Sequence, residues 1–365
     1  MSEREAGRRD RLRARAAEAG LDAVLVTNLL NVRYLTGFTG SNGVLLVRTD
    51  GQDLFGTDGR YTTQAGVQVP DVELLVDRGT ELAVARAAVS SGATRLGYES
   101  HVVTVDGLRA LERVTGEAAS AVELVSVRRA VEQLRAIKDD AEVDALRRAC
   151  AVADRALAEL AAEGALRPGR SELEVGRELD ARMLTLGAEA PSFETIVAAG
   201  ANSAIPHHRP DATVLRDGDL LKLDFGATVD GYHSDMTRTL VLGHAADWQR
   251  EVYELVAASQ AAGRAALAVG TEVAAVDAAS RDVIAAAGHG EHFTHGLGHG
   301  VGLEVHEAPS VSALGTGTLA AGMAVTVEPG VYLPGHGGVR IEDTLIVTDD
   351  EPELLTLTSK ELLVL

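Results

Sequence analysis

Hydrophobic and polar positions divide the chain into two parts with different patterns. In the first 130 residues, short apolar runs such as DAVLVTN and GVLLVRT alternate with segments such as TELAVARAAV, whose apolar residues lie three and four positions apart. Short apolar runs are typical of buried strands, and the three-and-four spacing is typical of helices. The alternation of the two predicts an α/β domain built around a small sheet.

The second part begins with a long helical pattern. The sequence QLRAIKDDAEVDALRRACAVADRALAEL keeps apolar residues at helical spacing, and the Arg-Pro-Gly sequence at 167–169 ends it. Ser171 followed by Glu174 is the signature of a capping box for the next helix. We place the domain boundary where the helical pattern starts, which gives domains 1–132 and 133–365.

Two strand-turn-strand segments, 219–242 and 324–348, follow in the second domain, and both carry acids. Two Ala-rich helical stretches, near 247–268 and 272–287, lie between them. The second domain is therefore expected to combine helices with hairpins.

The first of these segments allows a register to be read. Asp230-Gly231 between two strand-like runs predicts a two-residue hairpin turn. This turn sets Asp224 opposite Thr237. Because side chains alternate along a strand, Asp224 and Asp235 then lie on the same face as diagonal neighbours, within reach of each other.

Two carboxylates on one face of an apolar hairpin repel each other unless something compensates. A cation pair, a shared proton or a metal ion would each do so. The alternative is that one acid faces solvent and the other caps a turn, since charged residues are mostly exposed.

The second segment carries Glu328 at the end of the apolar run AVTV and Glu342 inside VRIEDTLIV. Pro329-Gly330 interrupts the first strand, so the register cannot be read there. An acid among strand apolars is unexpected without a partner, although Glu328 alone fits a turn acid equally well.

Between the two acid segments lies THGLGHGVGLEVHE, residues 294–307, with three histidines and four glycines. One of these histidines could complete a site of four carboxylates and one imidazole. Such a donor set suits Mn²⁺ and related divalent cations, and four negative charges match two such ions. A phosphate-binding loop is excluded, because the stretch has no G-x-G-x-x-G and no P-loop lysine.

Charge and cysteine content narrow the choice of partners. The chain has 34 basic and 54 acidic residues, a net charge of −20, which disfavours nucleic acid and anionic membrane as partners. The single cysteine, Cys150, excludes an internal disulfide and fits a helical core position. The highly charged N-terminus has no apolar signal region, and no apolar run is long enough to span a membrane. We expect a soluble cytoplasmic protein.

Taken together, these segments resemble the creatinase/prolidase/methionine aminopeptidase superfamily, the metallopeptidases of pita-bread fold. Within it the chain is similar to the Xaa-Pro peptidases, prolidase and aminopeptidase P. The resemblance covers nearly the whole chain. It rests on YLTGFTGSNG and TDGRYTTQA in the first domain and, in order, on AIPHHR, LDFGATVDGYHSDMTRT, HGLGHGVGLEVHE, VTVEPGVY and VRIED in the second.

The resemblance implies an α/β N-terminal creatinase-like domain, an α+β pita-bread catalytic domain and a homodimer. It also implies two divalent metal ions, with Mn²⁺ preferred and Co²⁺ or Zn²⁺ possible. Asp224 and Asp235 would chelate one metal, with Asp235 bridging, and His299 would bind the other. Glu328 would contact a metal and act as acid and base, and Glu342 would bridge both ions.

The resemblance also assigns residues around the metals. His207 would approach the substrate and assist proton transfer to the proline nitrogen, and His306 would hydrogen-bond the scissile carbonyl. His295 and Arg340 would support the site, with Arg340 pairing with a ligand carboxylate. Tyr332 fits either a supporting hydroxyl or plain packing. His208 is interpreted as a bystander.

One departure from the family bears on the substrate. Prolidases hold the C-terminal carboxylate of the dipeptide with an arginine after the histidine motif, but residues 282–339 contain no Arg or Lys. Arg60 in the first domain could supply that anchor. The sequence therefore favours an aminopeptidase P-like enzyme that acts on longer peptides with proline at position 2. A strict proline dipeptidase is the alternative.

Two other classes of function remain as rivals. One is a metal-free creatinase-like hydrolase, and the other is a catalytically inactive pita-bread module that binds peptides or proteins. Relatives of both kinds lack metal ligands, whereas this chain has all five. The sequence therefore favours the metallopeptidase.

Overall fold

The computed structural model describes residues 3–117 and 121–365. It divides into two compact units, Met1–Arg135 and Ala136–Leu365. The boundary predicted after residue 132 falls inside helix α6 (Ala130–Arg135), the last element of the first unit.

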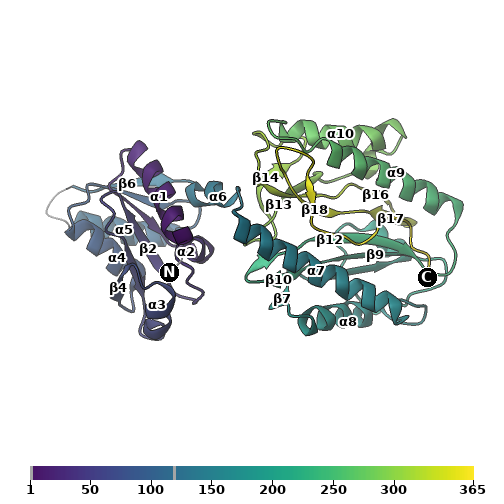
Figure 1. Ribbon diagram of the computed structural model, residues 1–365, viewed down its shortest axis with the longest axis horizontal. Coiled ribbons are helices and arrows are strands. Elements are labelled where there is room, and N and C mark those ends of the chain that lie inside the picture. The colour runs from purple at the N-terminus through teal and green to yellow at the C-terminus, as the bar shows by residue number, and fades with distance from the viewer. Residues whose placement is uncertain (1–2, 118–120) are drawn as a thin grey trace. The chain divides into compact units, whose positions relative to one another are not determined.

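The first unit is built on a six-stranded mixed sheet (Figure 1). The strand order is β4-β3-β2-β1-β5-β6. The β1–β5, β5–β6 and β3–β4 pairs are parallel, and the β1–β2 and β2–β3 pairs are antiparallel. The strands are β1 (Ala23–Val26), β2 (Val44–Arg48), β3 (Leu54–Thr57), β4 (Glu73–Val76), β5 (Arg95–Glu99) and β6 (Glu123–Val127).

Helices cover this sheet and bury its central strand. All four residues of β1 are buried, and Ala23 and Leu25 share a cluster with Val84 of α4 and Leu111 of α5. A central strand buried on both faces is typical of an α/β layer structure, as the alternating pattern predicts. Besides α6, the helices are α1 (Glu3–Glu18), α2 (Leu29–Thr36), α3 (Thr62–Gln68), α4 (Thr80–Ser90) and α5 (Val105–Gly116).

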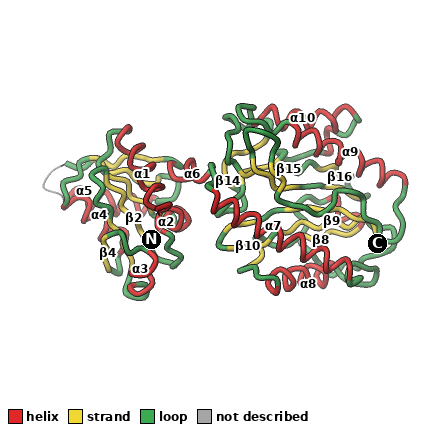
Figure 2. The backbone as a smooth tube through the Cα atoms, in the orientation of Figure 1, coloured by secondary structure: helices red, strands yellow, loops and turns green. Residues whose placement is uncertain are grey.

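In the second unit, strands lie between two pairs of helices (Figures 1 and 2). The capping box predicted at Ser171 and Glu174 is present at the start of α8. The two Ala-rich stretches form α9 and α10. The helical elements are α7 (Asp140–Ala162), α8 (Glu172–Thr185), α9 (Asp247–Ala265), α10 (Val273–Ala286) and the 3₁₀ turns η1 (Gly200–Ala204) and η2 (Gly290–His292).

The strands of this unit form a three-stranded sheet β12-β9-β8, a five-stranded sheet β14-β13-β15-β18-β19 and the smaller groups β11-β10-β7 and β16-β17. The first sheet and its neighbours are β7 (Ala190–Pro191), β8 (Ile196–Ala199), β9 (Leu220–Phe225), β10 (Ala227–Val229), β11 (Tyr232–His233) and β12 (Met236–Val241). The others are β13 (Gly298–Gly300), β14 (Glu307–Val311), β15 (Ala324–Val327), β16 (Gly330–Leu333), β17 (Gly337–Arg340), β18 (Asp343–Ile346) and β19 (Glu353–Leu354).

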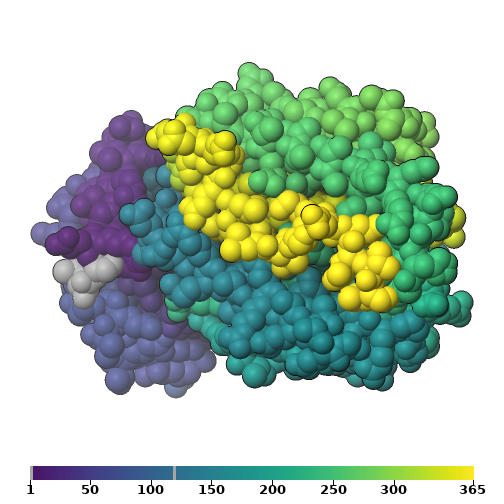
Figure 3. Space-filling model, turned by 45° about the vertical axis from the view of Figure 1, so that its right-hand side comes forward, coloured from purple at the N-terminus to yellow at the C-terminus, as the bar shows by residue number. Residues whose placement is uncertain are grey.

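The two helix pairs contribute to separate main cores. Apolar side chains of α7 and α8 form one core with β8, β9 and β12, and those of α9 and α10 form another with β15, β17 and β18. A smaller cluster joins α7 to β15 and β18. The C-terminal residues run across the surface between the two helix layers (Figure 3) and end beside β12, where Val364 bridges to Val241. The strands between the helix pairs are therefore enclosed from both sides, which leaves a sheltered place for polar chemistry.

Cys150 is fully buried in α7, as its apolar surroundings predict. In the part of the chain that the structure describes, every helix is too short or too polar to cross a membrane.

Candidate metal centre and active site

The first acid hairpin forms with the predicted register. Asp230 has a φ of 50° and Gly231 a φ of 73°, the left-handed conformations that a two-residue hairpin turn requires. Asp224 on β9 pairs with Thr237 on β12. Asp224 and Asp235 are both buried and line one cavity. The prediction that these two carboxylates share a face is confirmed.

The glycines of residues 294–307 allow three strands to close around one histidine. A Cβ atom at Gly298 would collide with the carbonyl oxygen of Thr326 on β15, and one at Gly300 would collide with the carbonyl oxygen of Ala308 on β14. His299 lies between these glycines on β13. Because neither neighbour has a side chain, the backbones of β14 and β15 approach closely enough to hold His299 at the cavity.

The imidazole of His299 is oriented by its own backbone. Its Nδ1 lies 3.0 Å from the carbonyl oxygen of Gly300, so Nδ1 carries the proton and donates it to that oxygen. Its Nε2 therefore faces the acids, 3.3 Å from Glu328 and 3.6 Å from Asp235. A histidine fixed in this way offers Nε2 as a metal ligand.

Glu328 and Glu342 are brought together by the pairing of β15 with β18. Val327 pairs with Asp343, so the residues just beyond this pair, Glu328 and Glu342, continue opposite each other. Both line the same cavity as Asp224. The turn-acid alternative for Glu328 is therefore wrong, because its carboxylate contacts His299 inside the cavity.

Burial and repulsion dominate the electrostatics of these acids. Burial raises the pKa of Asp235 well above its ordinary value, and the charge of Asp224 raises it further. Burial followed by the charge of Asp235 raises the pKa of Glu342 in the same way. Burial also opposes ionisation of Glu328, but its hydrogen bond to His299 together with the nearby positive charges outweighs this effect and lowers the pKa. The site thus holds more acid than its own bases neutralise.

An unpaired carboxylate oxygen indicates that the cavity suits cations. Oδ1 of Asp224 is buried without a hydrogen-bond partner, while Oδ2 faces Arg340. Ligand atoms of Asp235, His299 and Glu342 all lie within 4.8 Å of one another. An unpaired buried carboxylate oxygen is costly unless a cation compensates it, and carboxylates with one imidazole suit Mn²⁺ and similar divalent ions. The donor set therefore fits divalent metal ions.

Arg340 is buried behind Asp224 and does not line the cavity. Its Nε donates to the hydroxyl of Thr237 at 3.0 Å, and its Nη1 donates to the hydroxyl of Tyr332 at 2.8 Å. That hydroxyl in turn donates to Nε2 of His295 at 2.8 Å, since Nδ1 of His295 is used by a backbone carbonyl. Tyr332 therefore supports the site through its hydroxyl rather than by packing alone.

The cavity has a volume of about 650 Å³ and contains the other predicted histidines. The ring of His306 meets the ring of His299 edge to face, with centroids 4.4 Å apart. Burial and the nearby His299 lower the pKa of His306, which favours a neutral imidazole. His207 lines the same cavity from the loop after η1. Apolar lining comes from Phe193, Ile196 and Val305.

Arg60 is the one predicted site residue that does not belong to the second unit. It belongs to the first unit, where its exposed guanidinium pairs with Asp58 at 2.8 Å. The described residues that line the cavity all belong to the second unit. A role of Arg60 in substrate binding stays a prediction.

Several site residues have no signature in the sequence. Glu172 is buried and pairs with His208, Nε2 to Oε2 2.7 Å, so His208 is not the bystander that the sequence suggested. Lys222 is buried on β9, and burial followed by the charge of Arg340 lowers its pKa to about 6. Arg209 lines the cavity. Only long-range packing shows where these residues lie, and no local pattern marks them.

A second group of acids with a histidine, Glu99, His101 and Glu132, lies in the first unit. The amide Nδ2 of Asn31 donates to Glu99 at 2.6 Å and to Glu132 at 2.9 Å, and Nε2 of His101 lies 2.8 Å from Glu132. The protein's own donors thus already bridge the two carboxylates, which explains this cluster without a metal ion.

Comparisons with known proteins agree with this geometry. Residues 144–349 match metallopeptidase family M24, and residues 8–137 match the creatinase/prolidase N-terminal domain. The chain is 41% identical to the uncharacterised peptidase YqhT of Bacillus subtilis over 98% of this chain and 99% of that protein.

Two solved structures are similar over almost their whole length. An Xaa-Pro dipeptidase from Bacillus anthracis has a TM-score of 0.94 at 40% identity, covering 99% of this chain and 100% of that one. An X-Pro aminopeptidase from Thermotoga maritima has a TM-score of 0.88 at 32% identity, covering 98% and 99%. The chain belongs to metallopeptidase family M24, with a creatinase/prolidase N-terminal domain in front of a pita-bread catalytic domain.

Proposed function

We propose that this chain hydrolyses the peptide bond between an N-terminal residue and proline, with two divalent metal ions in the cavity. The observation that carries the proposal is the gathering of four carboxylates and one imidazole around the unpaired buried oxygen of Asp224. The similar proteins named as Xaa-Pro dipeptidase and X-Pro aminopeptidase support the choice of substrate.

The five proposed metal-holding residues are Asp224, Asp235, His299, Glu328 and Glu342. When bound, two such ions lower the pKa of a water molecule and polarise the substrate carbonyl. Neighbouring residues orient two of the proposed ligands for metal binding. Arg340 occupies one oxygen of Asp224 and leaves the other for a metal, and Gly300 fixes the proton of His299 on the nitrogen that faces away from the acids.

The bond before proline makes particular demands. It is a tertiary amide without an N–H, and its nitrogen must be protonated as it leaves. In our proposal Glu328 moves the proton within the site, His207 assists its transfer to the proline nitrogen, and the neutral His306 hydrogen-bonds the scissile carbonyl. The apolar lining at Phe193 and Ile196 suits a side chain or ring without charge.

The length of the substrate depends on what meets its C-terminal carboxylate. The absence of Arg and Lys from residues 282–339 favours longer peptides, in which this carboxylate lies far from the metals. Arg209 in the cavity favours the second candidate, a proline dipeptidase, because it offers a positive charge from another segment. We give this observation more weight, since Arg209 lines the cavity itself.

The test is hydrolysis of Ala-Pro and Ala-Pro-Ala by the Mn²⁺-loaded protein, with a chelated sample as control. We expect metal-dependent cleavage of both, with Ala-Pro cleaved at least as fast. A strong preference for Ala-Pro-Ala would restore the aminopeptidase P-like candidate. If neither peptide is cleaved with Mn²⁺, Co²⁺ or Zn²⁺, the proposal fails and the peptide-binding module becomes the better explanation.

Metal binding should stabilise the protein more at pH 8 than at pH 5.5. The raised pKa values of Asp235 and Glu342 mean that the metal-free fold holds protons there. Their contribution is present at low pH and is lost as pH rises through the folded pKa values. A metal ion competes with these protons and gains affinity as they leave.

We expect Mn²⁺ at about 100 times its Kd to raise the free energy of unfolding by about 2.7 kcal/mol at pH 8. This corresponds to a rise in Tm of roughly 5–10 °C. Thermal unfolding with Mn²⁺ or EDTA at both pH values measures this. The double variant Asp235→Asn/Glu342→Gln is the control and should show no metal-dependent shift. An equal shift at the two pH values in the wild type would contradict the assignment of these two acids.

The similarity leaves three finer points as predictions from the sequence. These are manganese as the resident metal, a homodimeric assembly and a cytoplasmic location.

A further inference from the structure

The loop between η1 and β9 is fastened to the core through its backbone. Nζ of Lys222 donates to the carbonyl oxygens of Ile205, at 2.6 Å, and Pro206, at 3.2 Å. Nη1 of Arg340 also donates to the carbonyl oxygen of Pro206 at 3.2 Å. Two buried basic side chains therefore hold the start of this loop beside the metal-holding strand β9.

The next part of the loop is fastened by a buried carboxylate. Glu172 is completely buried, and its Oε2 accepts from Nε2 of His208 at 2.7 Å and from the backbone N–H of Asp211 at 3.2 Å. Its Oε1 accepts from the backbone N–H of Ala199 at 2.7 Å and from the amide of Asn202 at 3.0 Å. The loop is thus tied to β8 and η1 at the position of His208.

This fastening leaves the two neighbours of His208 at the cavity. His207 and Arg209 are both exposed residues that line it. Nε of Arg209 lies 3.0 Å from Oε2 of Glu194, and the two side chains are 83% and 63% exposed. An ion pair this exposed contributes little free energy, so Arg209 can exchange Glu194 for another carboxylate at low cost.

Arg209 is a positively charged residue in a cavity that is lined by several acids. The lining includes five carboxylates, those of Glu194, Asp224, Asp235, Glu328 and Glu342. Among the described lining residues Arg209 is the one Arg or Lys. A substrate that ends just after proline brings a further carboxylate into this acidic space. It needs a fixed cation there, and a guanidinium can bind a carboxylate through two parallel hydrogen bonds.

We propose that Arg209 binds the C-terminal carboxylate of short Xaa-Pro substrates and takes it in exchange for Glu194. The loop fastened by Glu172 and Lys222 holds Arg209 in position for this. The inference rests on the proposed function, since it concerns the substrate of the same site. It makes Arg209 a specificity-determining residue that selects dipeptides, and it makes Glu194 a competitor that weakens their binding.

The experiment compares two substrates of equal length on the Mn²⁺-loaded full chain. Ala-Pro carries the carboxylate, and Ala-Pro amide replaces it with an uncharged carboxamide. The proteins are the wild type, Arg209→Ala, Arg209→Lys, Glu194→Gln and the control Arg216→Ala. Arg216 is an exposed arginine outside the cavity lining.

We expect Arg209→Ala to lower kcat/KM for Ala-Pro by about tenfold, mainly through KM, because one charge-assisted contact is lost. The same variant should change kcat/KM for Ala-Pro amide by less than about twofold, since the amide lacks the charge. Arg209→Lys should restore part of the loss, because it keeps the charge without the planar fork. Glu194→Gln should raise kcat/KM for Ala-Pro by about two- to threefold, as a weak competitor is removed. Arg216→Ala should match the wild type with both substrates.

The outcomes separate this inference from the proposed function. If the wild type cleaves both substrates and Arg209→Ala changes them by the same factor, the inference is wrong while the peptidase function stands. If Glu194→Gln lowers the rate on Ala-Pro, Glu194 is not a competitor and the exchange is wrong. If the wild type cleaves neither substrate with any of the three metals, the proposed function fails and this inference fails with it.

Discussion

Asp235→Asn and His299→Ala should each lower metal-dependent kcat/KM on Xaa-Pro peptides by more than roughly 100-fold, since even partners of metal ligands cost about 10–100-fold when lost. Both residues line the cavity, and Nε2 of His299 lies 3.6 Å from Asp235. Either change removes a donor from a set that has one imidazole and four carboxylates. The measurement is the rate on Ala-Pro or Ala-Pro-Ala at saturating Mn²⁺.

The two variants should differ in the stability of the metal-free protein. Asp235→Asn removes one of the mutually repelling buried acids, so the metal-free Tm should stay equal or rise. His299→Ala removes the partner of Glu328 and should lower stability by about 1–3 kcal/mol. Loss of activity without loss of stability in Asp235→Asn would separate a metal-binding role from a structural one.

A matched control lies on the same hairpin. Asp230→Asn changes the exposed carboxylate in the turn, and Asn tolerates the left-handed conformation that this position has. Its activity should equal that of the wild type. Retained activity in purified, metal-loaded Asp235→Asn or His299→Ala would contradict the ligand assignment.

The first acid pair could be placed from the sequence because local rules determine it. A two-residue Asp-Gly turn sets the register, and strand alternation then puts Asp224 and Asp235 on one face. The pair Glu328 and Glu342 could not be placed in this way. Their alignment depends on the pairing of β15 with β18, across a segment that includes β16 and β17, and no local signal specifies it.

The contacts of the loop at 205–211 also could not be predicted from local sequence signals. Ser171 and Glu174 predict the start of a helix, and the capping box is present in the structure. Glu172 lies inside that motif and looks like an ordinary first-turn acid, which is usually exposed. Its burial against His208 follows from how η1 and the loop fold over α8. Only the tertiary structure shows that this acid fastens the loop that carries His207 and Arg209.

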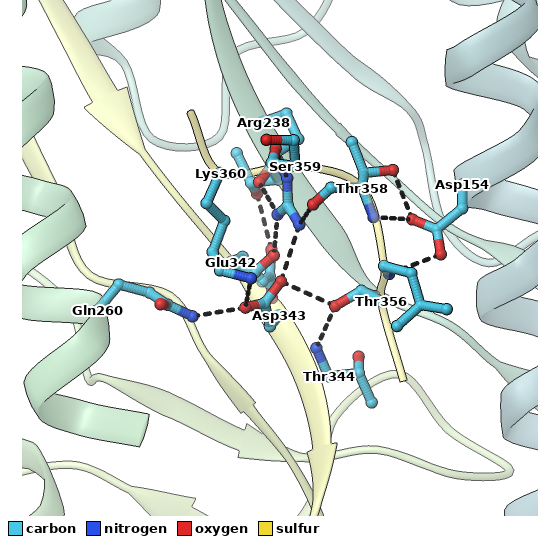
Figure 4. A network of polar contacts seen from close by, with 12 residues as sticks. Asp154, Arg238, Gln260, Glu342, Asp343, Thr344, Thr356, Thr358, Ser359 and Lys360 are labelled. Carbon is cyan, nitrogen blue, oxygen red and sulfur yellow. Dashed lines mark hydrogen bonds and ion pairs between the residues drawn. The ribbon is translucent and has the colours of Figure 1, made fainter. Parts of the chain in front are cut away.

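Behind Glu342 lies a second polar network, which Figure 4 shows in close view. Asp343 is completely buried and accepts from Arg238 Nη2 at 2.8 Å and from the hydroxyl of Thr356 at 2.9 Å. Its other oxygen accepts from Gln260 at 2.8 Å and from Lys360 Nζ at 2.9 Å. Burial opposes its ionisation, but the charges of Arg238 and Lys360 outweigh this and lower the pKa.

Arg238 links this network to the metal site and to the C-terminal segment. Besides Asp343, it donates to the carbonyl oxygens of Glu342, of Thr358 at 2.6 Å and of Ser359 at 3.1 Å. The backbone of one proposed metal-holding residue and the last segment of the chain therefore share a single buried guanidinium. Removing the charge of its partner Asp343 should therefore affect both the proposed metal site and the C-terminal segment.

Asp343→Asn should consequently destabilise the protein strongly. The amide keeps the shape of the side chain but removes its charge. Both oxygens of Asp343 accept hydrogen bonds, so the NH₂ group of the asparagine would face a donor where an acceptor is needed. Removing one partner from a buried ion pair costs about 3–5 kcal/mol, which corresponds to a fall in Tm of roughly 6–20 °C for a domain of this size. Thermal unfolding of the metal-free protein measures the stability, and calorimetric titration with Mn²⁺ measures the metal affinity, which should fall as well.

Lys360→Gln is the matched comparison, because it removes the other cation from the same carboxylate. The side chain of Lys360 is 24% exposed, whereas that of Arg238 is 2% exposed. A partly exposed pair is worth up to about 1 kcal/mol, so Lys360→Gln should lower Tm by only a few degrees and leave Mn²⁺ affinity unchanged. Equal effects of the two variants would mean that Asp343 acts on the C-terminal segment alone. A larger effect of Asp343→Asn on both stability and metal affinity would show that the buried Arg238–Asp343 pair holds the metal-bearing strand in place.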